Sequence, residues 1–364
     1  MWPNTRLTNL LNIEYPIVQA GMAGGITTPE LVAAVSNSGG LGTLGAGYQT
    51  PAQIRADIRE IRSLTSQPFA VNLFIPQVFQ VSKEHILQMQ QHLEGLYARF
   101  DAEMPKVTDI PNRVMTETFH EQLQVVLDEG VPIFSFTFGV PDEDVVRLCK
   151  QQQVVLIGTA TTIQEAKTLQ QAGVDVLVAQ GSEAGGHRGS FLRSSPPAGI
   201  GTFALVPQIA DEVNIPVIAA GGIMDGRGIA ASLMLGADGA QLGTAFLTCD
   251  ESGTHPSYKQ RVLESTDEST VLTRVFSGKW ARGIYNEMVN ALEDLDTLGV
   301  IPEYPIQNTL TRSIRQAAGK QNQSDYMSLW AGQGSALAKK GLAKDLMEQL
   351  TTEVKAVLDS HTRN

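Results

Sequence analysis

His187 stands in the segment of the chain whose composition is most suggestive of chemistry. Residues 180–190 read Gln-Gly-Ser-Glu-Ala-Gly-Gly-His-Arg-Gly-Ser, with four glycines close together. Glycine destabilises a loop through the entropy of the unfolded chain, so the close approach of backbone to a ligand is one explanation for so many of them. An imidazole with its ordinary pKa near neutrality suits proton abstraction or anion stabilisation. We therefore expect His187 to be catalytic.

Two charged neighbours of His187 each have two interpretations. Glu183 can orient the imidazole, or it can be a solvated loop charge. Arg188 can attract an anionic substrate, or it can point into solvent. The sequence does not choose between these roles.

Two glycine-containing motifs further along the chain predict a phosphate site. Gly221-Gly222 follows one apolar run, and Gly243-Thr244 follows the next. Phosphate needs several converging backbone N–H donors, glycine lets the backbone approach closely, and the hydroxyl of Thr244 can add a further donor. Either motif alone could be a tight turn. Together they predict a phosphate but no particular reaction, because sites for nucleotides, FMN and sugar phosphates share this pattern.

Amide side chains lie in or at the ends of several apolar runs. Asn72 and Gln180 each lie at such an end, and Gln241 lies within another run. Amides can pair with both the donor and the acceptor edges of a flavin ring, although each one taken singly can be structural. Met22 follows the first run and can equally be core packing or a flavin contact.

Composition excludes several classes of protein. The net charge of −11 argues against a nucleic-acid-binding protein, which needs a basic face. Cys149 and Cys249 show no zinc-ligand spacing, so we expect no metal site and no disulfide framework. The N-terminus lacks the order of a signal peptide, and no apolar run reaches the length of a membrane span. We expect a soluble, cytoplasmic protein.

Short β-branched runs alternate with helical patterns and predict how these residues are positioned. The runs are continuous rather than alternating, which is typical of parallel strands buried on both faces. Eight such units favour a (β/α)₈ TIM barrel, whose catalytic loops follow the carboxyl ends of the strands. The runner-up is a flavodoxin-like open sheet, which needs only five or six strands. The eight expected strands cover residues 15–20, 42–45, 69–74, 132–136, 154–158, 176–180, 216–220 and 239–242.

Two stretches break the βα rhythm. Residues 76 to about 115 contain a polar helix and a proline-containing stretch, and they read as an insertion or lid after the third strand. Residues 1–250 are then the barrel. Residues 251–364 are expected to be a helical C-terminal segment that packs over the barrel mouth, with helices near residues 287–295, 310–320 and 336–350.

The sequence resembles the nitronate monooxygenases, formerly called 2-nitropropane dioxygenases, and specifically those of class I. The likeness runs through nearly the whole chain and is most specific at the histidine motif and the two glycine motifs. Flavin-dependent enoyl-ACP reductases and some quinone reductases share much of it. The matching segments are residues 17–22, 71–74, 180–189, 219–226, 241–244, 276–279, 304–308 and 330–333.

The resemblance implies an α/β barrel that binds FMN. It implies that His187 is the catalytic histidine, that Met22 lies near the isoalloxazine, and that Tyr304 and Trp330 lie toward the substrate. Alkyl nitronates, such as propionate 3-nitronate, would react with O₂ to give carbonyl compounds and nitrite, without an external reductant. The implied FMN-binding residues are Met22, Asn72, Gln180, Gly185, Gly221, Gly222, Gln241, Leu242, Gly243 and Thr244.

Two other functions remain open at this point. An NAD(P)H-dependent FMN reductase acting on an enoyl thioester or a quinone would use the same histidine and phosphate motifs. A non-catalytic sensor of a phosphate ligand would use the glycine motifs alone. The sequence also leaves open whether the chain forms a homo-oligomer.

Overall fold

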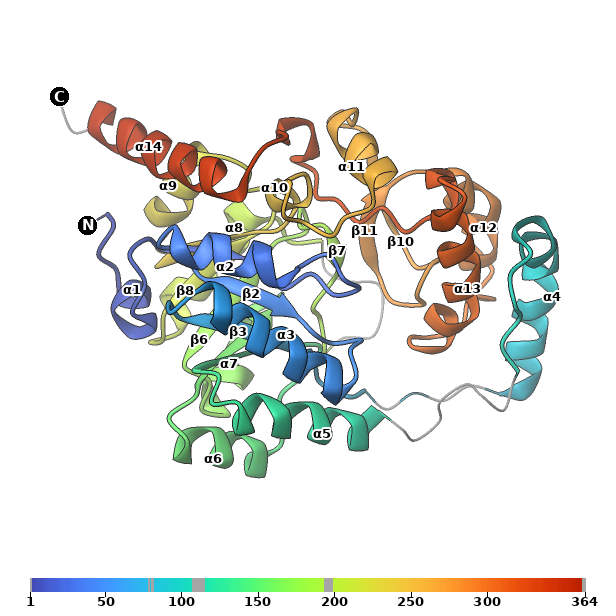
Figure 1. The fold of residues 1–364 in the computed structure, drawn as a ribbon, viewed down its shortest axis with the longest axis horizontal. Coiled ribbons are helices and arrows are strands. Elements are labelled where there is room, and N and C mark those ends of the chain that lie inside the picture. Colours follow the sequence, from blue (N-terminus) through green and yellow to red (C-terminus); the bar gives the residue numbers. More distant parts are fainter. Residues whose placement is uncertain (1, 78, 80–81, 107–114, 193–198, 362–364) are drawn as a thin grey trace.

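The computed structural model describes residues 2–77, 79, 82–106, 115–192 and 199–361, and Figure 1 shows their arrangement. Eight parallel strands form one sheet in the order β1-β9-β8-β6-β5-β4-β3-β2. A parallel bridge between Val18 and Leu41 joins β1 to the start of β2, so the sheet closes. The predicted TIM barrel is confirmed, and the open sheet is excluded. The strands are β1 (Ile17–Gln19), β2 (Gly42–Gly45), β3 (Phe69–Phe74), β4 (Ile133–Thr137), β5 (Val155–Ala160), β6 (Val176–Gln180), β8 (Val217–Ala220) and β9 (Gly239–Leu242).

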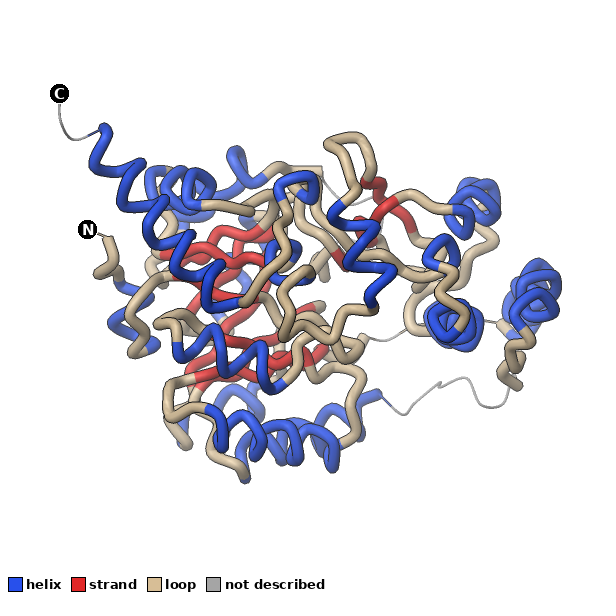
Figure 2. The backbone as a smooth tube through the Cα atoms, turned by 45° about the horizontal axis from the view of Figure 1, so that its top comes forward, coloured by secondary structure: helices blue, strands red, loops and turns tan. Residues whose placement is uncertain are grey.

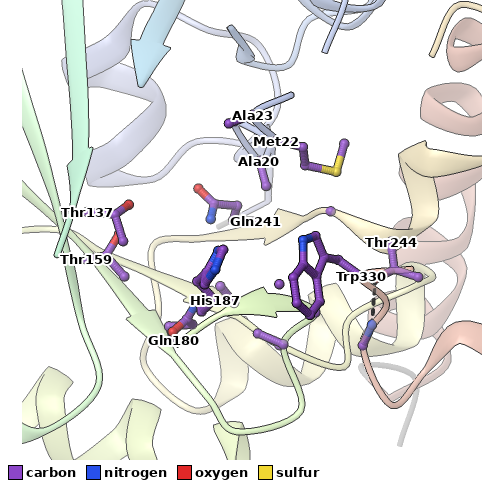
Figure 3. Close-up of a pocket in the computed structure, with 18 of the residues that line it drawn as sticks. Ala20, Met22, Ala23, Thr137, Thr159, Gln180, His187, Gln241, Thr244 and Trp330 are labelled. Carbon is purple, nitrogen blue, oxygen red and sulfur yellow. Dashed lines mark hydrogen bonds between the residues drawn. The ribbon is translucent and has the colours of Figure 1, made fainter. Parts of the chain in front are cut away.

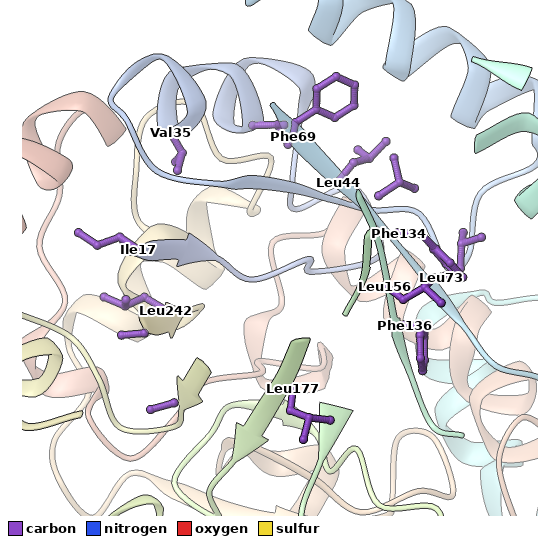
Figure 4. Packing of buried hydrophobic residues seen from close by; sticks show 14 of the residues in the cluster. Ile17, Val35, Leu44, Phe69, Leu73, Phe134, Phe136, Leu156, Leu177 and Leu242 are labelled. Carbon is purple, nitrogen blue, oxygen red and sulfur yellow. The ribbon is translucent and has the colours of Figure 1, made fainter. Parts of the chain in front are cut away.

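The apolar strand residues divide between two faces because successive side chains of a strand point in opposite directions. One set packs between the strands and the surrounding helices, and Figure 4 shows Ile17, Leu44 and Phe134 among its members. The other set fills the barrel interior, where Leu7 and Leu11 of α1 (Arg6–Leu11) join it. Burial on both faces explains why the runs read as continuous. Helix α1 itself was not expected from the sequence.

Threonine hydroxyls cap the first two helices that surround the barrel. The Thr28 hydroxyl accepts from Leu31 N, and the Thr50 hydroxyl accepts from Gln53 N, each with a proline in the first turn. These helices are α2 (Pro29–Asn37), α3 (Pro51–Leu64), α5 (Met115–Asp128), α6 (Glu143–Gln151), α7 (Ile163–Gln171), α8 (Thr202–Glu212), α9 (Gly226–Met234) and the short α10 (Thr244–Leu247).

The insertion and part of the C-terminal segment pack together as a cap with its own hydrophobic cluster. Met89 and Leu93 of α4 (Lys83–Phe100) pack with Leu310 and Ile314 of α13 (Ile306–Lys320), and Met288 of α12 (Glu287–Thr297) belongs to the same cluster. Figures 1 and 2 show these helices together on one side of the barrel. We use "cap" below for α4, α12, α13 and the two strands described next.

The sequence predicts a helical C-terminal segment, but the structure also contains strands there. Strands β10 (Thr270–Thr273) and β11 (Ala281–Ile284) form an antiparallel pair, and β11 also pairs with the two-residue strand β7 (Gly186–His187). The histidine motif is therefore part of a second sheet. Helix α11 (Pro256–Leu263) and the short helices η2 (Ser324–Tyr326) and η3 (Ser335–Leu337) complete this region.

The last helix, α14 (Ala343–His361), returns to the barrel and begins later than the predicted residue 336. Its Leu350 and Val354 belong to the barrel's main hydrophobic cluster, and the Glu353 carboxylate accepts from Gly226 N at 2.9 Å. Across the described part of the chain, no helix combines the length and the apolar character needed to cross a membrane.

Candidate functional site

A cavity opens at the carboxyl ends of the barrel strands, where TIM barrels carry their active sites. It holds about 1260 Å³ of space between atoms, counting its open mouth. The cavity is lined by the predicted residues Met22, Asn72, Gln180, Gly185, His187, Gly221, Gly222, Gln241, Gly243 and Thr244, several of which are labelled in Figure 3.

Leu242 is the predicted site residue that lies outside this cavity. Its side chain is 1% exposed and packs in the hydrophobic layer between the strands and the helices. The neighbouring Gln241 points to the opposite face of β9 and lines the cavity. Strand alternation therefore removes the Leu242 side chain from the site.

One end of the cavity, the glycine end, consists of Gly185, Gly221, Gly222, Gly243 and Thr244. Gly221 and Gly222 have φ angles of +117° and +73°, which L side chains rarely adopt. Gly243 is the N-cap of the short helix α10, so Thr244 begins that helix. The glycine end thus presents backbone and one hydroxyl rather than bulky side chains.

The chain after β11 covers the glycine end. Gly332 N donates to the Thr244 hydroxyl at 2.9 Å, the contact marked in Figure 3. A Cβ at Gly185 would lie 2.6 Å from both Ala331 C and Gly332 N. Only glycine fits at position 185 without a shift of the backbone, and this close contact joins the histidine loop to the C-terminal segment.

The opposite end, the aromatic end, surrounds His187. The ring centroid of His187 lies 5.8 Å from that of Phe138, 5.9 Å from that of Tyr304 and 5.3 Å from that of Trp330. Tyr304 and Trp330, both expected toward the substrate, thus lie against the candidate catalytic histidine. Figure 3 shows the Trp330 indole beside the imidazole.

Ser277 holds the His187 imidazole in place. The Ser277 hydroxyl lies 2.8 Å from Nε2 of His187 and donates to the carbonyl oxygen of Lys279 at 3.2 Å. The hydroxyl fits either neutral tautomer of the imidazole, because it can donate to Nε2 or accept from it. Pairing of His187 with Ala281 of β11 fixes the backbone as well.

The prediction that the pKa of His187 lies near neutrality is wrong. Burial lowers its pKa to about 3, and the positive charges of Lys279 and Arg315 lower it further. The imidazole is therefore neutral at physiological pH. It can accept a proton, but it cannot hold an anion as an imidazolium.

Two cations near His187 supply the positive charge that the imidazole lacks. The Lys279 ammonium donates to Gln77 Oε1 at 3.3 Å and to Ser190 O at 3.1 Å, and burial lowers its pKa to about 8. The Arg315 guanidinium donates to Asn308 Oδ1 at 2.8 Å, and burial lowers its pKa to about 10. These hydrogen-bond partners are neutral, but the carboxylates of Glu165 and Glu303 also act on Lys279, and neither cation belongs to the cavity lining.

Neither interpretation of Glu183 and Arg188 describes what they do. The Glu183 carboxylate accepts from Thr202 N at 2.8 Å and from its hydroxyl at 2.9 Å. It thereby caps α8, whose N-cap Gly201 has no side chain to do so. Arg188 is buried and donates to the carbonyl oxygens of Gln180 and Thr161. These hydrogen bonds hold the histidine loop against the ends of β5 and β6, and the guanidinium does not point into solvent.

Gln180 and Asn72 already have protein partners. The Gln180 amide donates to His187 O at 3.1 Å and accepts from Gly189 N at 2.8 Å, so it fixes the histidine loop. The Asn72 amide donates to the Ser135 hydroxyl at 3.0 Å.

Sequence reasoning missed several cavity residues, among them Tyr48, Ser135, Thr137, Phe138 and Thr159. Hydroxyls and rings at the ends of apolar strands were the available signal.

The two cysteines lie in the hydrophobic layer of the barrel. Burial raises the pKa of Cys149 to about 11 and that of Cys249 to about 12, so both are thiols of low reactivity. Within the described ranges, no three His, Cys, Asp or Glu side chains gather as a metal site would require.

Comparison with known proteins gives matches over almost the whole chain. A family model described as nitronate monooxygenase matches residues 4–353. A probable nitronate monooxygenase of Staphylococcus haemolyticus is 48% identical over 98% of this chain and 99% of its own length. The structure of nitroalkane oxidase from Streptomyces ansochromogenes superposes with a TM-score of 0.89 at 40% identity, covering 97% of this chain and 99% of that one. FabK from Thermotoga maritima gives a TM-score of 0.76 at 30% identity, covering 99% and 98%.

Proposed function

This chain belongs to the nitronate monooxygenase family and is an oxidoreductase, and we propose that it oxidises alkyl nitronates with O₂ by means of FMN. The products are a carbonyl compound and nitrite. Propionate 3-nitronate is the substrate that we propose for the test described below. The observation that carries the proposal is the aromatic end: a neutral, buried imidazole beside two cations with neutral hydrogen-bond partners.

The residues of the cavity fit FMN. Gly221 and Gly222 have left-handed φ angles and line the same cavity as Gly243 and Thr244 at the N-terminus of α10, so backbone N–H groups at the glycine end can bind a phosphate. Asn72, Gln180 and Gln241 also line the cavity. The Asn72 and Gln180 amides have protein partners, but each can form a further hydrogen bond to the edge of a flavin ring, as can Gln241. Bound FMN would supply the electron transfer between substrate and O₂.

The side chains around His187 suit an anionic carbon acid. The positive charges of Lys279 and Arg315 favour an anion next to His187, although neither side chain lines the cavity, and the neutral imidazole can accept a proton from a neutral nitroalkane. The rings of Phe138, Tyr304 and Trp330 exclude water around the imidazole. The chain thus binds the anion electrostatically and keeps the reacting region dry.

The reaction balances without a further reductant. Two nitronate anions and one O₂ contain the atoms and charge of two carbonyl compounds and two nitrite ions. The test is O₂ uptake and nitrite release from purified yellow protein with propionate 3-nitronate and no NAD(P)H. We expect both, and their absence would contradict the proposal.

The likeness to FabK supports one second candidate, an NAD(P)H-dependent FMN reductase. The same protein, mixed anaerobically with NADH or NADPH, distinguishes the two functions. Fast bleaching of the flavin favours the reductase, and a flavin that stays oxidised removes it. A colourless protein that binds no flavin would instead indicate a sensor of a phosphate ligand.

A further inference from the structure

Phe138 has an unusual backbone for its residue type. It directly follows β4 and has a φ of +79°, in the left-handed region that bulky L residues rarely adopt. Such strain persists where the surrounding structure enforces it, and it gathers at functional sites. Phe138 lines the cavity, yet its side chain is only 2% exposed, so packing holds it in place.

The Phe138 ring contacts two groups of the aromatic end. The His187 ring meets it edge-on, with an interplanar angle of 90° and centroids 5.8 Å apart. The ammonium nitrogen of Lys279 lies 4.7 Å from the centroid of the same ring. Phe74 and Tyr304 pack around it at 4.9 Å and 6.0 Å, so the ring has little freedom to move.

Gln77 ties the strained backbone to the cation. Its amide nitrogen donates to Phe138 O at 2.7 Å, and its amide oxygen accepts from the Lys279 ammonium at 3.3 Å. One side chain therefore stabilises the carbonyl of the left-handed residue and places the ammonium near the Phe138 ring. The three residues form a unit beside the catalytic candidate.

We propose that Phe138 is a positioning residue, whose ring fixes both the His187 imidazole and the Lys279 ammonium. The proposal rests on the proposed function only in taking His187 as the catalytic group. The left-handed backbone is what directs the ring into this place, because an extended residue at the end of β4 would point its side chain elsewhere.

The ring also keeps water from the ammonium. Burial is the main cause that lowers the pKa of Lys279, while the carboxylates of Glu165 and Glu303 act in the opposite direction. Neither carboxylate changes when Phe138 is shortened. Removing the ring therefore admits water and moves the pKa of Lys279 upward from about 8.

The test compares Phe138→Leu with Phe138→Tyr and with Phe136→Leu in the holoenzyme. Phe136 is a fully buried phenylalanine two residues earlier, in the hydrophobic layer and outside the cavity lining. The pKa of Lys279 is read by NMR titration of the reductively ¹³C-methylated protein. The kcat and KM for propionate 3-nitronate are measured beside it.

We expect Phe138→Leu to raise the pKa of Lys279 and to lower kcat at least about tenfold, because a misplacement of about 1 Å can cost about 10²-fold. Phe138→Tyr restores both, whereas Phe136→Leu lowers the melting temperature and leaves both unchanged. A Phe138→Leu protein with the wild-type pKa and kcat, or one that behaves like Phe136→Leu, would overturn the proposal. If Phe138→Leu does not fold, Phe138→Met takes its place.

The NMR titration separates this proposal from the proposed function. Should the wild-type protein not oxidise nitronates, the function fails, while the pKa of Lys279 in the two Phe138 variants still decides the role of the ring.

Discussion

The two ends of the cavity are built in different ways. The glycine end comes from loops that directly follow β8 and β9, with Gly185 from the histidine loop, and it offers mainly backbone. The aromatic end gathers His187, Phe138, Tyr304 and Trp330 from segments up to about two hundred residues apart. Local sequence determines the first end, and tertiary packing of the cap on the barrel determines the second.

This difference indicates that the two ends of the cavity have different functions. Backbone donors with fixed geometry suit a ligand group that never changes, such as a phosphate. Side chains with altered pKa values suit the reacting groups, and they depend on burial supplied by other parts of the chain. The glycine end should therefore control affinity for the cofactor, and the aromatic end should control turnover.

The largest effect should come from His187→Asn at the aromatic end. The amide keeps polar contacts but cannot accept the proton, so turnover of a neutral nitroalkane should fall about 10²–10⁴-fold while the protein stays yellow. Steady-state nitrite release and the flavin spectrum measure the two quantities. His92→Asn, on the exposed face of α4, is the control. Turnover near that of the wild type in His187→Asn would contradict the catalytic assignment.

A smaller effect is expected for Gly221→Ala at the glycine end, and it should change the affinity for FMN instead of turnover. Alanine is strained at a φ of +117°, and its Cβ would lie 2.8 Å from the Thr202 hydroxyl. We expect the dissociation constant of FMN to rise about tenfold, equivalent to about 1.4 kcal/mol, with kcat of the saturated enzyme nearly unchanged. Flavin fluorescence on release measures the affinity.

Gly173→Ala is the matched control for this variant. Its φ of +90° imposes similar strain, but its Cβ meets only Val146 at 3.5 Å, and Gly173 lies outside the cavity lining. Equal loss of FMN from both variants would mean that general destabilisation, and not the glycine end, governs binding.

The smallest effect is expected for Ser277→Ala. This change removes the partner of His187 Nε2 and leaves the aromatic rings in place. A hydrogen bond contributes about 0.5–1.5 kcal/mol, so kcat should fall about 2–10-fold. A loss as large as that of His187→Asn would show that Ser277 does more than orient the imidazole.

The sequence predicted the barrel well because its signals are local. Strands β2, β3, β6 and β9 begin and end where the apolar runs do. The glycine motifs and His187 were found for the same reason: each is a short pattern at the end of a strand. Leu242 was included with its neighbours, because the sequence does not show which face of β9 a residue occupies.

The rest depended on contacts that no local pattern reveals. Strands β10 and β11 have four residues each, and β11 meets β7 across about ninety positions of the chain. Ser277 is likewise distant from the imidazole that it holds. The low pKa of His187 follows from burial among side chains that are distant in the sequence, so an isolated histidine motif suggested the wrong protonation state.

The most direct test of the central claim is the visible spectrum of the purified protein during anaerobic addition of propionate 3-nitronate and, separately, of NADH. We predict that the nitronate reduces the bound flavin, that NADH leaves it oxidised, and that admitting O₂ restores the spectrum with release of nitrite. A flavin that responds to NADH and not to the nitronate would contradict the account.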